Sequence, residues 1–331
     1  MKKMTAWGLA LLTAFFVFFG TGVETVSEAA GKSENTEKSE KTEISETADF
    51  PPLNEAGFLD EGEFVYYGEK EGLWRYASDS LWVEIHRVSQ EKPARTWYEA
   101  EIRCAEGSET PHMIPNDPEK WLKSTTYPHK IARKNRTVIA ISNDYAQLRY
   151  RQKARMGIII RDGQIYSEKT RKKGANQFPT LDTLALLPDG DMQVYDSDEK
   201  TAQEYLEMGA RDVLAFGPWL IRDGEPNPTA AGPNYTYTHM KSDVNPRTVI
   251  GMIEPYHYIL MVVGIPQDNG KYLGANGEWL VNKLLELGCT EALNLDGGAT
   301  SYMLFNGKTI IHGRKANRTL ASMIAFGNLS D

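Results

Sequence analysis

One carboxylate at the end of an apolar strand is the residue best placed for chemistry in this sequence. Residues 293–305 read Leu-Asn-Leu-Asp-Gly-Gly-Ala-Thr-Ser-Tyr-Met-Leu-Phe, so Asp296 ends one short strand just before a second begins. Glycines beside a carboxylate let a ligand approach the backbone, although Asp-Gly also occurs in plain hairpin turns. A plain turn does not need the hydroxyl groups that follow. The segment therefore predicts ligand contacts from Asp296, Gly297, Gly298, Thr300 and Ser301.

A second polar cluster follows the apolar strand predicted at 137–142. Its sequence is Ser142-Asn143-Asp144-Tyr145, which places a carboxylate and an amide at a strand end. An ordinary strand-end turn has the same composition, so the segment alone leaves both readings open. Asn143 and Asp144 are candidate site residues.

A rigidly presented arginine is the third candidate. In Asn245-Pro246-Arg247-Thr248 the proline fixes its own φ and holds Asn245 extended, just before an apolar strand at 249–253. A guanidinium held in this way suits a phosphate or carboxylate, and the alternative is an ordinary surface arginine. His239, slightly upstream, is a further candidate acid or ligand.

The segments between these clusters predict a strand-rich domain with few helices. Short apolar runs separated by turn residues are typical of antiparallel strands. Helices are predicted at 127–134, 201–208 and 278–287, the last with an apolar stripe that ends at Gly288. We therefore expect an α+β fold, a mixed, mostly antiparallel sheet with helices packed on it. The predicted strands are 64–67, 73–76, 81–88, 97–104, 137–142, 157–161, 164–167, 183–187, 192–195, 213–216, 219–222, 249–253, 258–263, 302–305 and 308–311.

The N-terminal sequence predicts export. A basic start precedes an uncharged stretch at 5–23, and small residues that a signal peptidase prefers follow it. The stretch is also long enough to stay as a membrane anchor, and in both cases the rest of the chain lies outside the membrane. We expect a signal peptide or anchor at 1–30, a disordered charged linker at 31–52, a β-rich part at 53–118 and the main domain at 119–331.

Composition limits the partners and cofactors. The formal net charge is −8, and the acidic linker carries part of it, which argues against a nucleic-acid partner. Contact with a membrane is expected only through the N-terminal segment. Cys104 and Cys289 can pair in an exported protein or stay as isolated thiols. No Cys/His spacing indicates zinc, but Asp144 and Asp296 can share a hard cation such as Ca²⁺ or Mg²⁺.

Taken in order, the motifs resemble those of the phosphodiester glycosidases. This family is similar to the catalytic domain of the lysosomal mannose 6-phosphate uncovering enzyme and has many exported bacterial members. The resemblance covers about residues 120–330. The matching segments are Ser142-Asn143-Asp144-Tyr145, residues 155–163, Phe216-Gly217-Pro218, residues 245–251 and residues 294–298.

The resemblance implies an exported hydrolase that releases a sugar from a glycosyl-1-phosphodiester in cell-envelope or extracellular polysaccharide. An oxocarbenium-like transition state needs a carboxylate near the anomeric carbon. We expect Asp296 to be the nucleophile or base, Asp144 the second carboxylate, and Arg247 the phosphate ligand. The substrate-binding residues are expected to be Asn143, Asn245, Gly297, Gly298, Thr300, Ser301 and His239.

Two departures from the family pattern support an alternative. The family usually has Asn and Gly where this chain has Ser142 and Ala299, so one amide is lost and one methyl group is added. The alternative is a catalytically inactive envelope module that binds a phosphate-containing glycan, such as teichoic acid or exopolysaccharide. Both readings predict a glycan phosphate partner at the outer face of a Gram-positive-like envelope.

Overall fold

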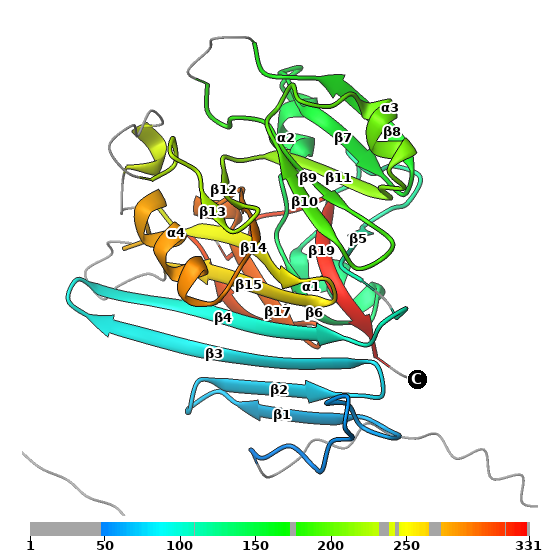
Figure 1. Ribbon diagram of the computed structural model, residues 1–331, viewed down its shortest axis with the longest axis vertical. Helices are drawn as coiled ribbons and strands as arrows, with labels where there is room; N and C mark the ends of the chain where they lie inside the picture. The colour runs from blue at the N-terminus through cyan, green and yellow to red at the C-terminus, as the bar shows by residue number, and fades with distance from the viewer. Residues whose placement is uncertain are drawn as a thin grey trace, which may run out of the picture. The chain divides into compact units, whose positions relative to one another are not determined.

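Antiparallel strand pairing organises the fold (Figure 1). The computed structural model describes residues 48–108, 110–172, 177–231, 238–241, 245–264, 273–314 and 316–329. The expected export segment at 1–30 and residues 31–47 of the expected linker lie outside the described residues. Among the residues that are described, no helix is both long and apolar enough to span a bilayer.

The largest sheet joins the N-terminal strands to the strands that lead into the candidate site. Its nine strands lie in the order β1-β2-β3-β4-β15-β14-β16-β12-β13, with every pair antiparallel. Figure 1 shows the long β3 and β4 running past β15, with β1 and β2 at the outer edge. The strands are β1 (Phe64–Gly68), β2 (Leu73–Ala77), β3 (Leu81–Glu91), β4 (Ala94–Cys104), β12 (Trp219–Arg222), β13 (Glu225–Pro226), β14 (Arg247–Glu254), β15 (His257–Val263) and β16 (Glu291–Leu295).

Two five-stranded antiparallel sheets complete the described strands. One has the order β10-β9-β11-β7-β8, and the other has the order β18-β17-β6-β19-β5. A single hydrophobic cluster draws on all three sheets, for example through Ile85, Leu184, Leu260 and Phe326. The strands are β5 (His112–Pro115), β6 (Thr137–Ile141), β7 (Gly157–Arg161), β8 (Gln164–Lys169), β9 (Asp182–Leu186), β10 (Met192–Tyr195), β11 (Asp212–Phe216), β17 (Tyr302–Phe305), β18 (Lys308–His312) and β19 (Ser322–Asn328).

The described helices are short and begin and end at recognisable signals. Thr201 and Glu204 form a capping box at the start of α3, and the Asn276 side chain accepts from the Trp279 N–H at the start of α4. Gly288, with φ +83°, follows α4 as the sequence predicted. The helices are α1 (Pro128–Lys134), α2 (Ala146–Arg151), α3 (Ala202–Glu207) and α4 (Gly277–Glu286), with single 3₁₀ turns η1 (Thr238–Met240) and η2 (Gly298–Thr300).

The mostly antiparallel character of the fold is confirmed, but its division into sheets is not as expected. The sequence predicted one mixed sheet with helices packed on it, whereas the described residues form three sheets and few helices, so the fold is mostly β. Alternating burial identifies strands but does not specify which strands pair. Neither α2 nor the edge strand β5 was predicted, and β19 was also missed. Cys104 and Cys289 are both buried and are not joined in a disulfide.

Candidate active site

The ends of three strands meet at one pocket. Asp296 follows β16, Arg247 begins β14, and Phe216 ends β11. The strands β14 and β16 are neighbours, and the Gly217 N–H donates to the Asn294 carbonyl at 3.0 Å, which ties the end of β11 to β16. The pocket has a volume of about 170 Å³ and is lined by Phe178, Phe216, His239, Asn245, Pro246, Arg247, Leu295, Asp296, Gly297 and Gly298. Six of the residues predicted from the sequence therefore lie around one cavity.

Asp296 is the carboxylate of this pocket. Burial raises its pKa to about 6, while the Thr300 hydroxyl and the nearby Arg149 and Arg318 act in the opposite direction. Its side chain still contributes to the pocket wall, and its backbone N–H donates to the Asn143 carbonyl at 3.1 Å. A carboxylate whose pKa lies near neutrality is suited to exchange protons or to react at neutral pH.

The two glycines after Asp296 serve different structural needs. Gly298 has φ +65°, and its N–H donates to the Pro246 carbonyl at 2.9 Å. At Gly297 a Cβ atom would lie 2.4 Å from that same carbonyl oxygen, so only glycine allows the approach. The Gly297 N–H donates to the Asp296 carboxylate. Both N–H groups thus bond within the protein, which differs from the predicted role of binding a ligand.

Arg247 lines the pocket but is anchored to the protein. Its Nε donates to the Ala275 carbonyl at 2.8 Å and its Nη2 to the His239 carbonyl at 2.5 Å. The guanidinium therefore holds the η1 segment and the start of α4 against β14. Asn245 lies beside it and accepts from Arg314 Nη2 at 2.9 Å through Oδ1.

Asp144 does not lie on the pocket wall, which corrects the prediction of a second carboxylate there. It is fully buried and pairs with Arg161, whose Nη2 lies 2.9 and 2.8 Å from the two carboxylate oxygens. The backbone N–H groups of Ala146 and Ala215 donate to the same oxygens. A carboxylate saturated in this way is a structural anchor rather than a group facing substrate.

The other predicted polar residues are buried close to this network. Asn143 Nδ2 donates to Ser322 Oγ at 2.7 Å, and its Oδ1 accepts from the Tyr145 N–H, so the amide is fully used inside the protein. Thr300 is buried with its hydroxyl on Asp296. Ser301 is buried, and its hydroxyl has no hydrogen-bond partner among the described residues.

Several residues that support the site were missed by sequence reasoning. Asp182, at the start of β9, has a pKa raised to about 6 by burial, and its Oδ2 accepts from the Trp219 N–H at 3.3 Å. Phe178 stacks on His239 with ring centroids 4.7 Å apart and forms one side of the pocket. Arg161 ends a run of isoleucines, and a charged residue within such an apolar run was the available signal.

The donor set does not fit a cation shared by Asp144 and Asp296. The Asp144 oxygens are taken by Arg161 and backbone N–H groups. Among the described residues, no group of three or more His, Cys, Asp or Glu side chains is arranged to hold a metal ion. We therefore derive no catalytic step through a metal.

Comparison with known proteins places this site in a family. Residues 135–327 match the phosphodiester glycosidase family, so the chain belongs to the phosphodiester glycosidases. The matched range contains Asp144, Arg247 and Asp296.

A curated relative and two solved structures are similar to the chain. The SPbeta prophage-derived uncharacterized protein YomE of Bacillus subtilis (strain 168) is 30% identical over 158 residues, which is 47% of this chain and 22% of YomE. This chain thus spans about a fifth of that relative. The zebrafish N-acetylglucosamine-1-phosphodiester alpha-N-acetylglucosaminidase catalytic domain, auto-inhibited by its pro-peptide, has a TM-score of 0.55 at 17% identity, over 76% of this chain and 85% of that one. A hypothetical protein from Synechocystis has a TM-score of 0.53 at 12% identity, over 80% of this chain and 63% of that one. These two likenesses establish the fold.

Proposed function

We propose that the protein hydrolyses a glycosyl-1-phosphodiester, cleaving the bond between the anomeric carbon of a sugar and a phosphate oxygen. The observation that carries this proposal is the Asp296 carboxylate, which lies on the wall of a small pocket with its pKa raised to about 6. A carboxylate beside the anomeric carbon is the group that glycoside hydrolysis needs. Membership of the phosphodiester glycosidases supports the same reaction class.

The size and lining of the pocket suit one sugar ring. Its volume of about 170 Å³ is below the ~300–1,000 Å³ of sites that take drug-sized ligands. Phe178 and His239 are stacked, and Phe216 meets the Phe178 ring edge-on at 5.6 Å. Aromatic faces pack well against the C–H groups of a sugar, which would hold the ring beside Asp296.

In the proposed reaction the Asp296 side chain reacts as a deprotonated carboxylate, in one of two ways. As a nucleophile, it bonds to the anomeric carbon while the carbon–oxygen bond breaks and its electron pair leaves with the phosphate; water then releases the sugar. As a base, it takes the proton from a water molecule that attacks directly. Both routes yield a free sugar and a phosphate monoester. Because the phosphate is a good leaving group, the reaction does not require Asp144 as a second acid.

Positive charge near Asp296 supports departure of the phosphate. Arg149 and Arg318 act electrostatically on the Asp296 carboxylate, and Arg247 lines the same pocket. Charge that develops on the leaving oxygen is stabilised most by cations that are already positioned. Arg149 is held by carbonyls of Asp144, Met156 and Ala215, so its position is fixed before substrate binds.

We place the substrate in cell-envelope or extracellular polysaccharide and the protein at the outer face of the membrane or free outside the cell. The support is the N-terminal sequence, with its basic start and uncharged stretch. The membrane would be contacted only through that segment.

An inactive glycan-phosphate binder is the second candidate. One specific observation favours it: Asp144 forms a buried ion pair with Arg161, so Asp296 is the single carboxylate among the described residues that line the pocket. A binder would hold glycan phosphates without releasing sugar.

Product analysis in water labelled with heavy oxygen tests the proposal. The full chain is incubated with UDP-GlcNAc and a panel of other glycosyl phosphodiesters, with and without EDTA. We expect free sugar together with an unlabelled phosphate product, because water adds to the anomeric carbon and the bridging oxygen leaves with the phosphate. Label in the phosphate would indicate a phosphodiesterase that cleaves the phosphorus–oxygen bond. Binding without turnover of any substrate would favour the second candidate.

A further inference from the structure

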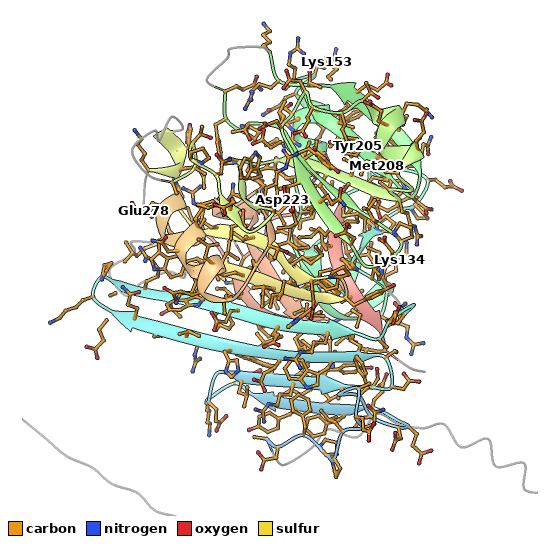
Figure 2. The ribbon with its side chains drawn as sticks, viewed as in Figure 1. Lys134, Lys153, Tyr205, Met208, Asp223 and Glu278 are labelled. Atoms are coloured by element: carbon orange, nitrogen blue, oxygen red, sulfur yellow. The ribbon has the colours of Figure 1, made fainter. Side chains whose placement is uncertain are left out.

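One segment of this acidic protein is strongly basic. Residues 120–155 contain ten lysines and arginines and one carboxylate, Asp144, which is buried against Arg161. Eight of the ten are exposed, at positions 120, 123, 130, 133, 134, 151, 153 and 155. Figure 2 labels two of them, Lys134 at the end of α1 and Lys153 just after α2. Such a concentration of one charge in a chain of net charge −8 indicates a surface for an anionic partner.

Two exposed tyrosines lie within this basic segment. Tyr127 and Tyr150 are 40% and 39% exposed, and Leu285 is the only other large apolar side chain so exposed among the described residues. The Lys130 ammonium lies 5.8 Å from the Tyr127 ring centroid, and the Lys123 ammonium lies 5.9 Å from that of Tyr150. Exposed rings flanked by cations are typical of surfaces that bind sugars and phosphates together.

A series of contacts connects this segment to the Asp296 carboxylate. Arg151 Nη2 lies 3.4 Å from the Tyr145 hydroxyl, and the Arg318 guanidinium lies 4.6 Å from the Tyr145 ring centroid. Thr126 and Leu320 form a β-bridge, which brings the Tyr127 segment beside the Arg318 segment. Arg318 in turn acts on the Asp296 carboxylate. The surface therefore leads toward the reacting group.

The cations of this surface are available to a ligand. Lys123, Lys130, Arg151 and Arg318 form no ion pair with any described carboxylate. Asp117, which lies just before the segment, pairs with Lys120 at 3.3 Å. We name the set Lys123, Tyr127, Lys130, Tyr150, Arg151 and Arg318 the basic tyrosine surface.

We propose that the basic tyrosine surface binds a polyanionic glycan chain whose repeats are joined by phosphodiesters, and delivers one of its glycosyl phosphates to Asp296. The proposal rests on the proposed function, because the glycosyl phosphates of such a chain are the groups that Asp296 would cleave. Spaced cations match the repeated charges, and the tyrosine rings offer faces for the sugars. Nucleic acid and anionic membranes carry negative charge as the proposed glycan does, so the experiment includes both as competing ligands.

Charge-reversal variants of the full chain test the proposal. The variant Lys123→Glu/Lys130→Glu changes the surface, and Lys70→Glu/Lys92→Glu makes the same change in net charge at exposed hairpin positions of the N-terminal strands. Binding is measured to a polymer of sugar repeats joined by glycosyl-1-phosphodiesters, to single-stranded DNA and to phosphatidylglycerol vesicles, at about 0.05 M and about 0.5 M salt. Melting temperatures of both variants verify folding.

We expect wild type to prefer the polymer over DNA and vesicles and to lose about tenfold or more in affinity at the higher salt. The surface variant should lose about tenfold at low salt, and the control variant less than about twofold. The ratio of polymer turnover to UDP-GlcNAc turnover should fall in the same variant. Equal losses in both variants, or tighter binding of DNA or vesicles, would overturn the proposal. If UDP-GlcNAc and the panel are not hydrolysed, the proposed function fails, while the binding comparison still decides whether the surface takes the polymer.

Discussion

At the scale of single residues, the two carboxylates singled out by the sequence have opposite environments. Asp296 lies on a pocket wall with its pKa raised to about 6, whereas Asp144 is saturated by Arg161 and backbone N–H groups. Sequence spacing identified both, because each follows an apolar strand, but it did not separate the carboxylate on the pocket wall from the one in a buried ion pair. The separation depends on Arg161, which lies on another sheet and is distant in sequence from Asp296.

The raised pKa of Asp296 predicts that Asp296→Asn stabilises the fold at neutral pH. The pKa rises from 3.8 to about 6 on folding, so the folded state holds the proton more tightly. The stabilising contribution is complete below pH ~4 and is lost as the pH rises through ~6. A pKa difference of one unit corresponds to about 1.36 kcal/mol, and partial exposure of the carboxylate to solvent reduces this effect. We therefore expect the variant to be about 1–3 kcal/mol more stable than wild type at pH 7.5. Urea unfolding at pH 4 and 7.5 measures the difference in unfolding free energy between the variant and wild type. A difference that does not grow with pH would contradict the prediction.

The ion pair of Asp144 predicts the reverse effect for Asp144→Asn. Removing the carboxylate leaves the Arg161 charge buried without its partner, which costs about 3–5 kcal/mol. The matched control is Asp162→Asn, in the exposed pair of Asp162 with Arg211 at 2.8 Å, where we expect less than about 1 kcal/mol. Denaturant unfolding of both variants gives the comparison, and similar losses in the two would refute the structural assignment.

At the scale of elements, the site depends on one contact between two turns. The Asp296-Gly297-Gly298 turn packs on the Asn245-Pro246-Arg247 segment, and β14 pairs with β16 just behind it. Both segments could be found from the sequence because each has a proline or glycine signature at a strand end. Their proximity could not, because it follows from the pairing of strands that are about 45 residues apart.

This contact predicts that Gly297→Ala impairs the site. A Cβ there would meet the Pro246 carbonyl oxygen at 2.4 Å, so the two turns must move apart. We expect a lower melting temperature and a loss of about tenfold or more in kcat/KM, since small displacements in a site are costly. Gly224→Ala is the control, because its φ is +77° with nothing within 4 Å, and it should cost about 1–2 kcal/mol without changing kcat/KM. Equal kcat/KM in the two variants would contradict the account.

At the scale of the whole molecule, apolar patterning predicted most strands but not their assembly. The strands predicted at 157–161 and 164–167 form a hairpin, as do those at 302–305 and 308–311. Their turn residues, Asp162-Gly163 and Asn306-Gly307, all have positive φ. The three-sheet arrangement depends on a core shared by residues far apart in sequence, such as Ile85 and Phe326. The strand β19 was missed because six of its seven residues are buried, so it lacks the alternation of buried and exposed residues that identifies a strand with one face in water.

The buried cysteines predict that reductant does not affect stability. Cys104 and Cys289 are buried and are not joined in a disulfide, and burial raises the pKa of the Cys289 thiol to about 12. A thiol reagent should therefore react slowly with the native protein and label both thiols after unfolding without reduction. Unchanged melting temperature with and without reductant is the companion measurement. An unreduced, unfolded chain without reactive thiols would instead indicate a disulfide.

The most direct test of the central claim is the rate of sugar release by wild type and Asp296→Asn on whichever glycosyl phosphodiester wild type cleaves. Asp223→Asn, on the exposed turn between β12 and β13 (Figure 2), is the matched control. We expect Asp296→Asn to lose about three orders of magnitude or more in kcat/KM, Asp223→Asn to match wild type, and wild-type kcat/KM to rise as the pH passes about 6. Retained turnover in a folded Asp296→Asn protein would contradict the assignment of Asp296 as the catalytic carboxylate.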